Sequence, residues 1–220
     1  MTPIRHAKRP RWQRRKEARP GEIVTAALGV FVERGFAATK LDDVARRAGV
    51  TKGTMYLYFD SKEALFKAVV REAVIPTIER GEQLIAEHQG SARELLAELI
   101  RGWWQQIGES PASGLPKLMI SEAANFPEVA RFYHQEVVQR GRRLFARVLE
   151  RGIASGEFRA LDVPYALRSI GFAIMFAAVW KHSIACHETE TFDFERFITT
   201  HIDVVLRGIL AEPREERSHA

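Results

Sequence analysis

The sequence predicts an all-α protein of nine helices in two domains, an N-terminal helix-turn-helix domain joined by a long helix to a C-terminal bundle. Three observations lead to this prediction. Apolar residues recur at spacings of three and four along almost the whole chain after Pro20. No stretch alternates apolar and polar side chains as a half-buried strand would. Glycines, prolines and capping residues divide the pattern into segments of helical length.

The composition is that of an ordinary globular protein. The chain has 220 residues, of which 46% are hydrophobic and 28% charged, so it is long enough to bury a core. Its one cysteine, Cys186, excludes an intrachain disulfide and favours a reducing, cytoplasmic setting. No apolar segment follows the basic N-terminus, so we expect no secretory signal. The longest uncharged apolar stretch, 169–180, is shorter than the roughly 20 residues of a membrane span.

Positive charge is concentrated at one end of the chain. Residues 1–60 carry 13 Lys and Arg against 6 Asp and Glu, whereas the other 160 residues carry 20 against 22. An excess of cations in one segment favours a polyanionic partner such as DNA. Residues 1–19 hold eight of these cations and little apolar periodicity, and we expect them to form a disordered basic arm.

Residues 20–66 are expected to form the first domain. Its first helix is predicted from Pro20 or Gly21 to Arg34, and Gly35 is expected to end this helix in a left-handed cap. Its second helix is predicted over 41–48, where the Thr-x-x-acid pattern that starts at Thr39 is a capping box.

Thr51 is expected to cap a third helix that ends at Tyr58. Two short helices separated by a glycine turn are the layout of a helix-turn-helix. The third helix leaves these residues for solvent or a ligand: Thr51, Lys52, Gly53, Thr54, Tyr56 and Tyr58. Hydroxyls, an ammonium group and phenols suit a phosphate-lined major groove, although Tyr56 could instead be partly core.

This region resembles the TetR family of repressors. The resemblance is carried by residues 23–36 (IVTAALGVFVERGF), 43–45 (DVA), 48–59 (AGVTKGTMYLYF) and 61–65 (SKEAL). Beyond residue 68 the resemblance extends only to the number of helices.

The resemblance implies roles for individual residues. Thr39 and Lys62 match phosphate contacts at the starts of the second and fourth helices. The recognition-helix contacts would be Lys52, Gly53, Thr54, Tyr56 and Tyr58. Leu57 stands where many relatives carry a polar or aromatic residue, so a base contact from this position is doubtful. Arg14, Arg15 and Lys16 could reach an adjacent minor groove or phosphates, unless the arm stays disordered on DNA.

Residues 67–212 are expected to form a ligand-binding and dimerisation domain, followed by a disordered tail over 213–220. Asp60 and Glu63 are expected to cap the fourth helix, which Pro76 should kink. The predicted helices from here on are 60–88, 92–107, 116–125, 127–153, 162–186 and 192–210.

Large apolar and aromatic side chains crowd this second half. The resemblance implies that the bundle binds a small-molecule effector, and these side chains suggest a lipophilic or aromatic one. The candidate lining residues are Trp103, Trp104, Met119, Glu122, Phe126, Tyr133, His134, Phe172, Met175, Phe176 and Trp180. The eighth helix is apolar all round and must be covered on more than one side. The resemblance implies a homodimer through the helices near 162–187 and 192–210.

Two other classes of function are disfavoured. His182 and Cys186 stand four residues apart, a spacing that can hold zinc or copper, but no fourth ligand lies in register. We therefore predict no metal and no cofactor. No Gly-x-Ser-x-Gly, His-Glu-x-x-His or phosphate-binding glycine loop is present, which argues against an enzyme. A ligand-independent architectural DNA binder would not need so aromatic a second half.

These observations predict a repressor that binds a roughly palindromic operator as a dimer. The two recognition helices of such a dimer enter successive major grooves about 34–36 Å apart. A ligand in the C-terminal bundle is expected to move the fourth helix and so release the operator.

Overall fold

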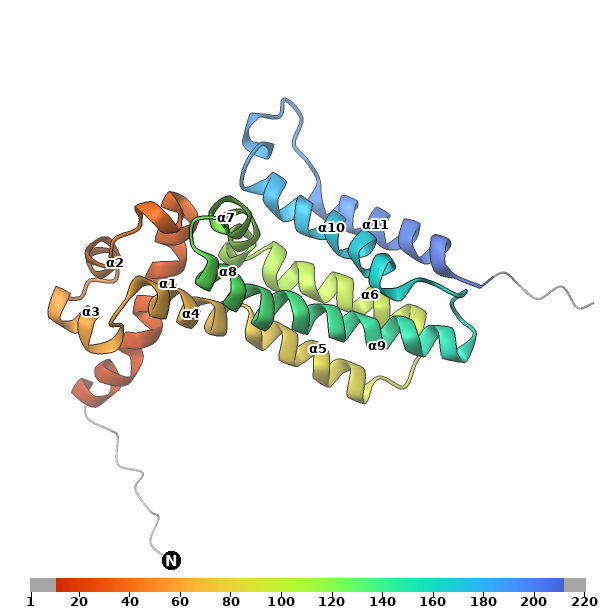
Figure 1. Cartoon of the computed structure of the whole chain (residues 1–220), viewed down its shortest axis with the longest axis horizontal. Coiled ribbons are helices and arrows are strands. Elements are labelled where there is room, and N and C mark those ends of the chain that lie inside the picture. The colour runs from red at the N-terminus through yellow and green to blue at the C-terminus, as the bar shows by residue number, and fades with distance from the viewer. Residues whose placement is uncertain (1–10, 212–220) are drawn as a thin grey trace, which may run out of the picture. The chain divides into compact units, whose positions relative to one another are not determined.

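The protein is helical throughout the part that the structure, a computed structural model, describes. This part comprises residues 11–211, with side chains from residue 20 onward. Extended pairing within it is limited to one isolated antiparallel bridge between Phe158 and Leu210. The all-α prediction is confirmed. The chain divides into two compact units, Met1–Val69 and Val70–Ala220, and the division falls inside helix α4 (Lys62–Ala73) (Figure 1).

The first helix is longer than expected. Helix α1 spans Arg11–Ala38, so the predicted start at Pro20 is wrong. Residues 11–19 lack apolar periodicity, but most of them are intrinsically good helix formers, and this outweighs the missing N–H of a proline inside the helix. The arm predicted over 1–19 is therefore helical from Arg11. Residues 1–10 and 212–220, which include the rest of the arm and almost all of the predicted tail, lie outside the described residues.

Gly35 interrupts α1 near its end. Its φ of 84° is positive, as expected for a C-terminal cap, but its ψ of 167° is not that of a left-handed turn. Backbone of this kind is essentially confined to glycine. One further helical turn follows to Ala38. A substitution with a side chain at Gly35 would therefore strain the chain just before the helix-turn-helix.

The helix-turn-helix is formed by α2 (Leu41–Arg47) and α3 (Lys52–Tyr58). The turn between them passes through Gly49, whose φ is 65°. The expected cap at Thr51 is confirmed, because its hydroxyl accepts a hydrogen bond from the N–H of Thr54 at 3.1 Å.

Two other predicted caps are wrong. The residue that precedes α2 is Lys40, which makes no side-chain cap, so Thr39 stands one position too early to cap this helix. Helix α4 is capped by Ser61, whose hydroxyl accepts from the N–H of Ala64 at 3.0 Å, and not by Asp60. The cap of α4 thus lies one residue later than predicted, whereas α2 has no side-chain cap.

Three aromatic rings form the centre of the first unit. Phe31, Phe36 and Phe66 are fully buried, and their ring centroids lie 5.5 to 5.7 Å apart. Aromatic pairs at these separations add to the burial of apolar area. The cluster joins α1 to α4 and leaves α2 and α3 at the surface of the unit.

The second unit is a helical bundle. Its α-helices are α5 (Ile75–Glu87), α6 (Ala92–Trp103), α7 (Leu115–Glu122), α8 (Pro127–Tyr133), α9 (Arg140–Ser155), α10 (Val163–Lys181) and α11 (Phe194–Ile209). Short segments connect them: the π-helices η1 (Trp104–Gly108) and η3 (His134–Gln139), and the 3-10 helices η2 (Pro111–Gly114) and η4 (Ala185–His187). Helices α5, α6 and α9 pack against one another, and α10 and α11 lie side by side (Figure 1).

Three of the expected helices are interrupted, and the one predicted over 92–107 gives way to the π-helix η1 after Trp103. The predicted helix 60–88 is kinked as expected near Pro76, but the break is complete. It falls at Val74, where φ and ψ are −118° and −46°, and α5 then starts with Pro76 in its first turn. The predicted helix 127–153 contains the π-helix η3. Such π-helical turns are rare and are often found at functional sites.

Helix α6 is capped from a distant part of the chain. Ser91 and Glu94 form a capping box at its start. The Glu157 carboxylate accepts from the N–H groups of Ala92 and Arg93 at 3.1 and 3.2 Å. Burial by itself raises the pKa of Glu157, but these two N–H groups and the Ser155 hydroxyl outweigh it, so the pKa lies below its ordinary value.

Glu157→Gln is expected to destabilise the bundle by about 1 kcal/mol at pH 7, as loss of a helix cap does. Because the folded-state pKa is depressed, the stabilisation is present above the ordinary pKa of a glutamate and is lost as the pH falls below it. Urea unfolding at pH 7 and about pH 3.5 measures both effects. Glu150→Gln, at an exposed position of α9, is the matched control. Equal losses for the two variants would show that the cap contributes nothing.

Candidate DNA-binding surface and ligand cavity

Helix α3 has one buried and one exposed side. Met55 is fully buried and anchors the helix. On the other side Tyr56 is 47% exposed and Leu57 71% exposed, and Lys52 and Gly53 are exposed as well. Thr54 and Tyr58 are half-buried. The exposed side of α3 therefore presents an ammonium group, a bare backbone, a phenol and an isobutyl group.

Lys52 is held near α2 in the absence of DNA. Its ammonium group donates to the Asp42 carboxylate at 3.0 Å, which raises the pKa of Lys52, and it lies 5.8 Å from the centroid of the Tyr56 ring. An exposed ion pair of this kind contributes little, because water screens the two charges. A DNA phosphate can therefore displace Asp42 at little cost.

Thr39 and Lys62 both contact the end of α1. The Thr39 side chain is buried, and its hydroxyl donates to the Gly35 carbonyl at 2.7 Å, so it does not face solvent as the predicted phosphate contact requires. The half-buried Lys62 donates to the carbonyls of Phe36 and Ala37 at 2.6 and 3.1 Å, and its ammonium lies 4.5 Å from the Phe36 ring centroid. Both side chains therefore hydrogen-bond to the backbone of residues 35–37 at the end of α1. Arg14, Arg15 and Lys16 lie in the first turns of α1, and their side chains are outside the described part.

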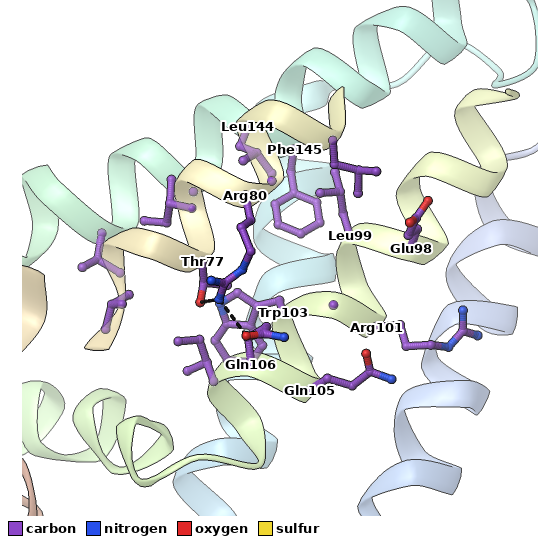
Figure 2. A pocket seen from close by; sticks show the side chains of 18 residues that line it. Thr77, Arg80, Glu98, Leu99, Arg101, Trp103, Gln105, Gln106, Leu144 and Phe145 are labelled. Carbon is purple, nitrogen blue, oxygen red and sulfur yellow. Dashed lines mark hydrogen bonds between the residues drawn. The ribbon is translucent and has the colours of Figure 1, made fainter. Parts of the chain in front are cut away.

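A cavity of about 310 Å³ lies in the second unit between α5, α6 and α9. Residues of the π-helices η1 and η3 complete its wall (Figure 2). Its apolar lining comprises Val74, Ile78, Leu84, Leu99, Trp103, Ile107, Val137, Leu144 and Phe145. Its polar lining comprises Thr77, Arg80, Glu98, Arg101, Gln105 and Gln106. A largely apolar cavity with a few polar groups is typical of small-molecule sites, and this volume lies at the small end of their range.

Each of the three helices around the cavity contributes one glycine to its wall. These are Gly81 in α5, Gly102 in α6 and Gly141 in α9. A Cβ atom at Gly102 or Gly141 would meet nothing within 4 Å, whereas one at Gly81 would lie 2.7 Å from the Leu144 side chain. Glycine inside a helix costs about 1 kcal/mol relative to alanine. At Gly102 and Gly141, both in the cavity lining, the space that a side chain would occupy is open.

Of the eleven predicted ligand-binding residues, Trp103 is the one that lines this cavity. Its neighbour Trp104 is instead 1% exposed and stacks on Phe194 with 5.4 Å between the ring centroids. Met119 and Glu122 are buried in α7. Phe126 and Tyr133 are half-buried at the two ends of α8, where burial raises the pKa of the Tyr133 phenol.

The remaining predicted ligand residues also lie outside the cavity wall. His134 is exposed in η3, and Met175 and Trp180 are half-buried in α10. The indole N–H of Trp180 is buried without an acceptor among residues 11–211. Phe172 and Phe176 are 53% and 58% exposed. The prediction relied on aromatic content, but most of these rings pack the bundle or face outward. The signal that could have located the cavity is the set of glycines within helical patterns.

His182 and Cys186 do not share a helical face as the sequence suggested, because α10 ends at Lys181 and Cys186 lies in the 3-10 helix η4. The His182 ring lies 2.7 Å from the Ser113 hydroxyl, which itself donates to the Ser110 carbonyl. Burial and the nearby cations Lys181 and Lys117 lower the pKa of His182. Among the described side chains, no group of three or more His, Cys, Asp or Glu is placed to hold a metal ion.

Helices α10 and α11 each expose large apolar side chains. Tyr165, Phe172 and Phe176 on α10 are 69%, 53% and 58% exposed, and Val204 on α11 is 62% exposed. The α10 residues are seven and four positions apart, which places them on one side of the helix. With a mean hydropathy of 1.5, the 19-residue α10 is long and apolar enough to cross a membrane by length and composition. The uncharged stretch 169–180 is shorter than this helix and therefore underestimates the length of its apolar segment.

Comparisons with known proteins agree with this arrangement. Residues 23–69 match the family described as bacterial regulatory proteins, tetR family, and residues 86–190 match a tetracyclin repressor-like C-terminal domain. The HTH-type transcriptional repressor KstR2 of Rhodococcus jostii is 29% identical over 167 residues, which cover 75% of this chain and 80% of the relative. The fatty acid metabolism regulator protein of Bacillus subtilis is 30% identical over 158 residues, covering 70% and 80%.

A solved structure has the same fold. The transcriptional regulator FadR from Bacillus subtilis, in complex with stearoyl-CoA, aligns with a TM-score of 0.70 at 25% identity, covering 86% of this chain and 98% of that one. Both halves of the chain therefore match, the helix-turn-helix at the level of sequence and the bundle at the level of sequence and fold. The chain belongs to the TetR family of bacterial regulatory proteins, a family of transcriptional regulators.

Proposed function

We propose that the protein is a cytoplasmic repressor that binds a palindromic DNA operator as a homodimer and is released by a small lipophilic or aromatic ligand. The observation that carries this proposal is the capped helix α3, whose exposed side bears Lys52, Tyr56 and Leu57. Similar proteins are named as a repressor and as a regulator of fatty acid metabolism, which supports repression in response to a small molecule.

The proposed DNA contacts come from α3 and the residues around it. Lys52 and the hydroxyls of Thr51 and Thr54 would contact phosphates, and Gly53 would let the backbone approach the groove. Tyr56 would reach the groove floor or a phosphate, with the half-buried Tyr58 beside it. Leu57 joins this set, because its exposed isobutyl group is of a kind that contacts the methyl group of thymine. Lys62, at the start of α4, would contact a phosphate as well.

The homodimer would form through the apolar face of α10 and α11. Three exposed aromatic residues on one side of a helix are unusual in a monomer and typical of the centre of an interface. A two-fold dimer also matches a palindromic operator, because each half-site then meets one recognition helix.

The cavity is the proposed effector site. Val74, which lines the cavity, is also the residue at which α4 ends and α5 begins. Helix α4 continues from there into the first unit. A ligand that displaces Val74 would thus act on the segment that joins the cavity to the helix-turn-helix. The coupling between ligand and operator is typically worth about 1–3 kcal/mol.

Selection of bound DNA from a random-sequence pool, at about 0.15 M salt, tests the proposal. We expect a palindromic motif to be enriched, with half-sites one helical turn apart or a multiple of it. Salt-sensitive binding without any enriched motif would contradict the proposal and would favour an architectural DNA binder.

Tyr56→Ala is expected to weaken binding to the selected operator by tenfold or more without lowering the stability of the protein. The side chain is 47% exposed and lies over Lys52, so its removal leaves no cavity in the core. A lost contact to DNA costs about 1–3 kcal/mol. Fluorescence anisotropy measures the affinity and urea unfolding the stability. Met55→Ala, at the buried neighbouring position, should instead destabilise the first unit. If Tyr56→Ala destabilised it as much, Tyr56 would be a core residue.

A further inference from the structure

The cavity wall carries more positive than negative charge. Two guanidinium groups, of Arg80 and Arg101, and one carboxylate, of Glu98, line it. No carboxylate in the described part of the chain forms an ion pair with either guanidinium. The Glu98 carboxylate lies instead 3.7 Å from Nδ1 of His88. The wall therefore has cations without matching anions.

Arg80 is oriented by neutral partners. Its Nη2 donates to Oε1 of Gln106 at 2.6 Å, across from α5 to η1, and to Oγ1 of Thr77 at 3.1 Å (Figure 2). Within residues 11–211, neither Nε nor Nη1 of Arg80 donates a hydrogen bond. A guanidinium presents its donors in a planar fork that matches a carboxylate or phosphate. Thr77 and Gln106 thus hold the Arg80 guanidinium through Nη2, and its Nε and Nη1 can donate to an anion.

Arg101 has a different orientation. Figure 2 shows its side chain extending away from the group formed by Arg80, Thr77 and Gln106. It carries the same charge and belongs to the same wall, but it has no comparable neutral anchor among the described residues. Arg101 is therefore a natural control for the effect of charge alone.

The rest of the cavity suits an apolar body. Leu99, Leu144 and Phe145 lie on the side of the cavity opposite Gln106 (Figure 2). The open space at Gly102 and Gly141 adds room between the helices. Burying apolar area in such a cavity stabilises a complex in proportion to the area removed from water.

We propose that the cavity binds an amphipathic anion. Its carboxylate or phosphate head would lie on the exposed guanidinium of Arg80, and its apolar body between α5, α6 and α9. This proposal rests on the proposed function, in which the cavity is the effector site. It deepens that function by naming the charge of the ligand and the residue that selects it.

Two pairs of probes test the proposal, each with one apolar body and two head groups: laurate with 1-dodecanol, and 2-naphthoate with 2-naphthol. Isothermal titration calorimetry of the full chain gives the affinities. In at least one pair we expect the anion to bind about tenfold more tightly than its neutral partner, the size of one charged hydrogen-bond contact. Arg80→Gln should abolish this preference, and Arg101→Gln should leave most of it.

A second pair of variants shows where the probes bind. Gly102→Phe fills open space in the cavity and should prevent binding of both probes of a pair. The Ala86→Phe variant, altered at an exposed position of α5 outside the cavity wall, should bind the probes as tightly as the unaltered protein does.

Several results would overturn the proposal. One is that none of the four probes binds, and another is that the anion and its neutral partner have equal affinity in both pairs. Equal effects of the two arginine variants, or unchanged binding to Gly102→Phe, would contradict it as well. Operator binding measured without any probe tells whether only the anion proposal has failed or the proposed function as well. A protein that binds its palindrome and ignores the charge of the probes would still be a regulator, but not one that selects an anion.

Discussion

Replacing Phe172 and Phe176 together by glutamate is expected to convert the protein from a dimer into a monomer. Both rings stand exposed on α10, which faces the proposed partner. Burying two unpaired carboxylates in an apolar interface costs several kcal/mol for each charge. Because the rings are already exposed in the single chain, their replacement should not weaken its fold. Sedimentation velocity measures the change of mass directly.

Loss of the dimer should also remove operator binding. In a dimer the second half-site is bound intramolecularly, and linkage of this kind raises affinity by about 10²–10⁴. We therefore expect the double variant to bind the selected palindrome at least about a hundredfold more weakly.

Ile120→Glu is the matched control. Ile120 is 63% exposed on α7 and belongs to neither α10 nor α11, so this substitution adds a charge at an apolar surface position outside the two helices of the proposed interface. It should leave both the dimer and the operator affinity unchanged. A dimer that survives both glutamates, or that dissociates equally with Ile120→Glu, would show that the subunits meet elsewhere.

Trp104→Ala is expected to lower the free energy of unfolding of the second unit by about 3–5 kcal/mol, as loss of a large buried aromatic does. The side chain is 1% exposed and stacks on Phe194 at the start of α11. The ammonium of Lys181, at the end of α10, lies 5.9 Å from its ring centroid. A Cβ at Gly108 would collide with the indole, so the ring packs directly on this backbone. One side chain thus joins η1 to both α10 and α11.

Trp103→Ala is the comparison for this prediction. Trp103 is the adjacent residue and has the same size, but it is half-buried and borders the open cavity, so its removal creates less new empty volume. We expect a clearly smaller loss of stability in urea unfolding and a change in probe binding. Equal losses for the two variants would contradict the assignment of Trp104 to the core and Trp103 to the cavity wall.

Local patterns in the sequence were sufficient for the helices and for the DNA-binding motif. The helical period, the Gly49 turn and the Thr51 cap depend on residues within a few positions of each other, so they can be recognised along the chain. The same holds for the break at Pro76, since proline acts on its own helix. Register was less certain. The cap of α4 lies at Ser61 and not at the neighbouring Asp60, and Thr39 donates to the end of α1 and does not cap α2.

The location of the cavity could not be derived in this way. Whether an aromatic ring is core, cavity wall or outer face depends on which helices meet around it, and these lie far apart in the sequence. Trp103 and Trp104 are neighbours with identical chemistry, yet one lines the cavity and the other fills the core. Arg80 carries no sequence signal at all, because its role depends on Gln106 from another helix.

The sequence by itself therefore determined the all-α fold, the helix-turn-helix and the family, all of which depend on local periodicity and on an ordered motif. The tertiary structure alone decided that Thr39 faces inward, that α10 leaves Phe172 and Phe176 uncovered, and that α5, α6 and α9 surround a cavity beside Arg80. The physical reason is that burial and hydrogen-bond partners are properties of packed helices, which a single helical pattern does not contain.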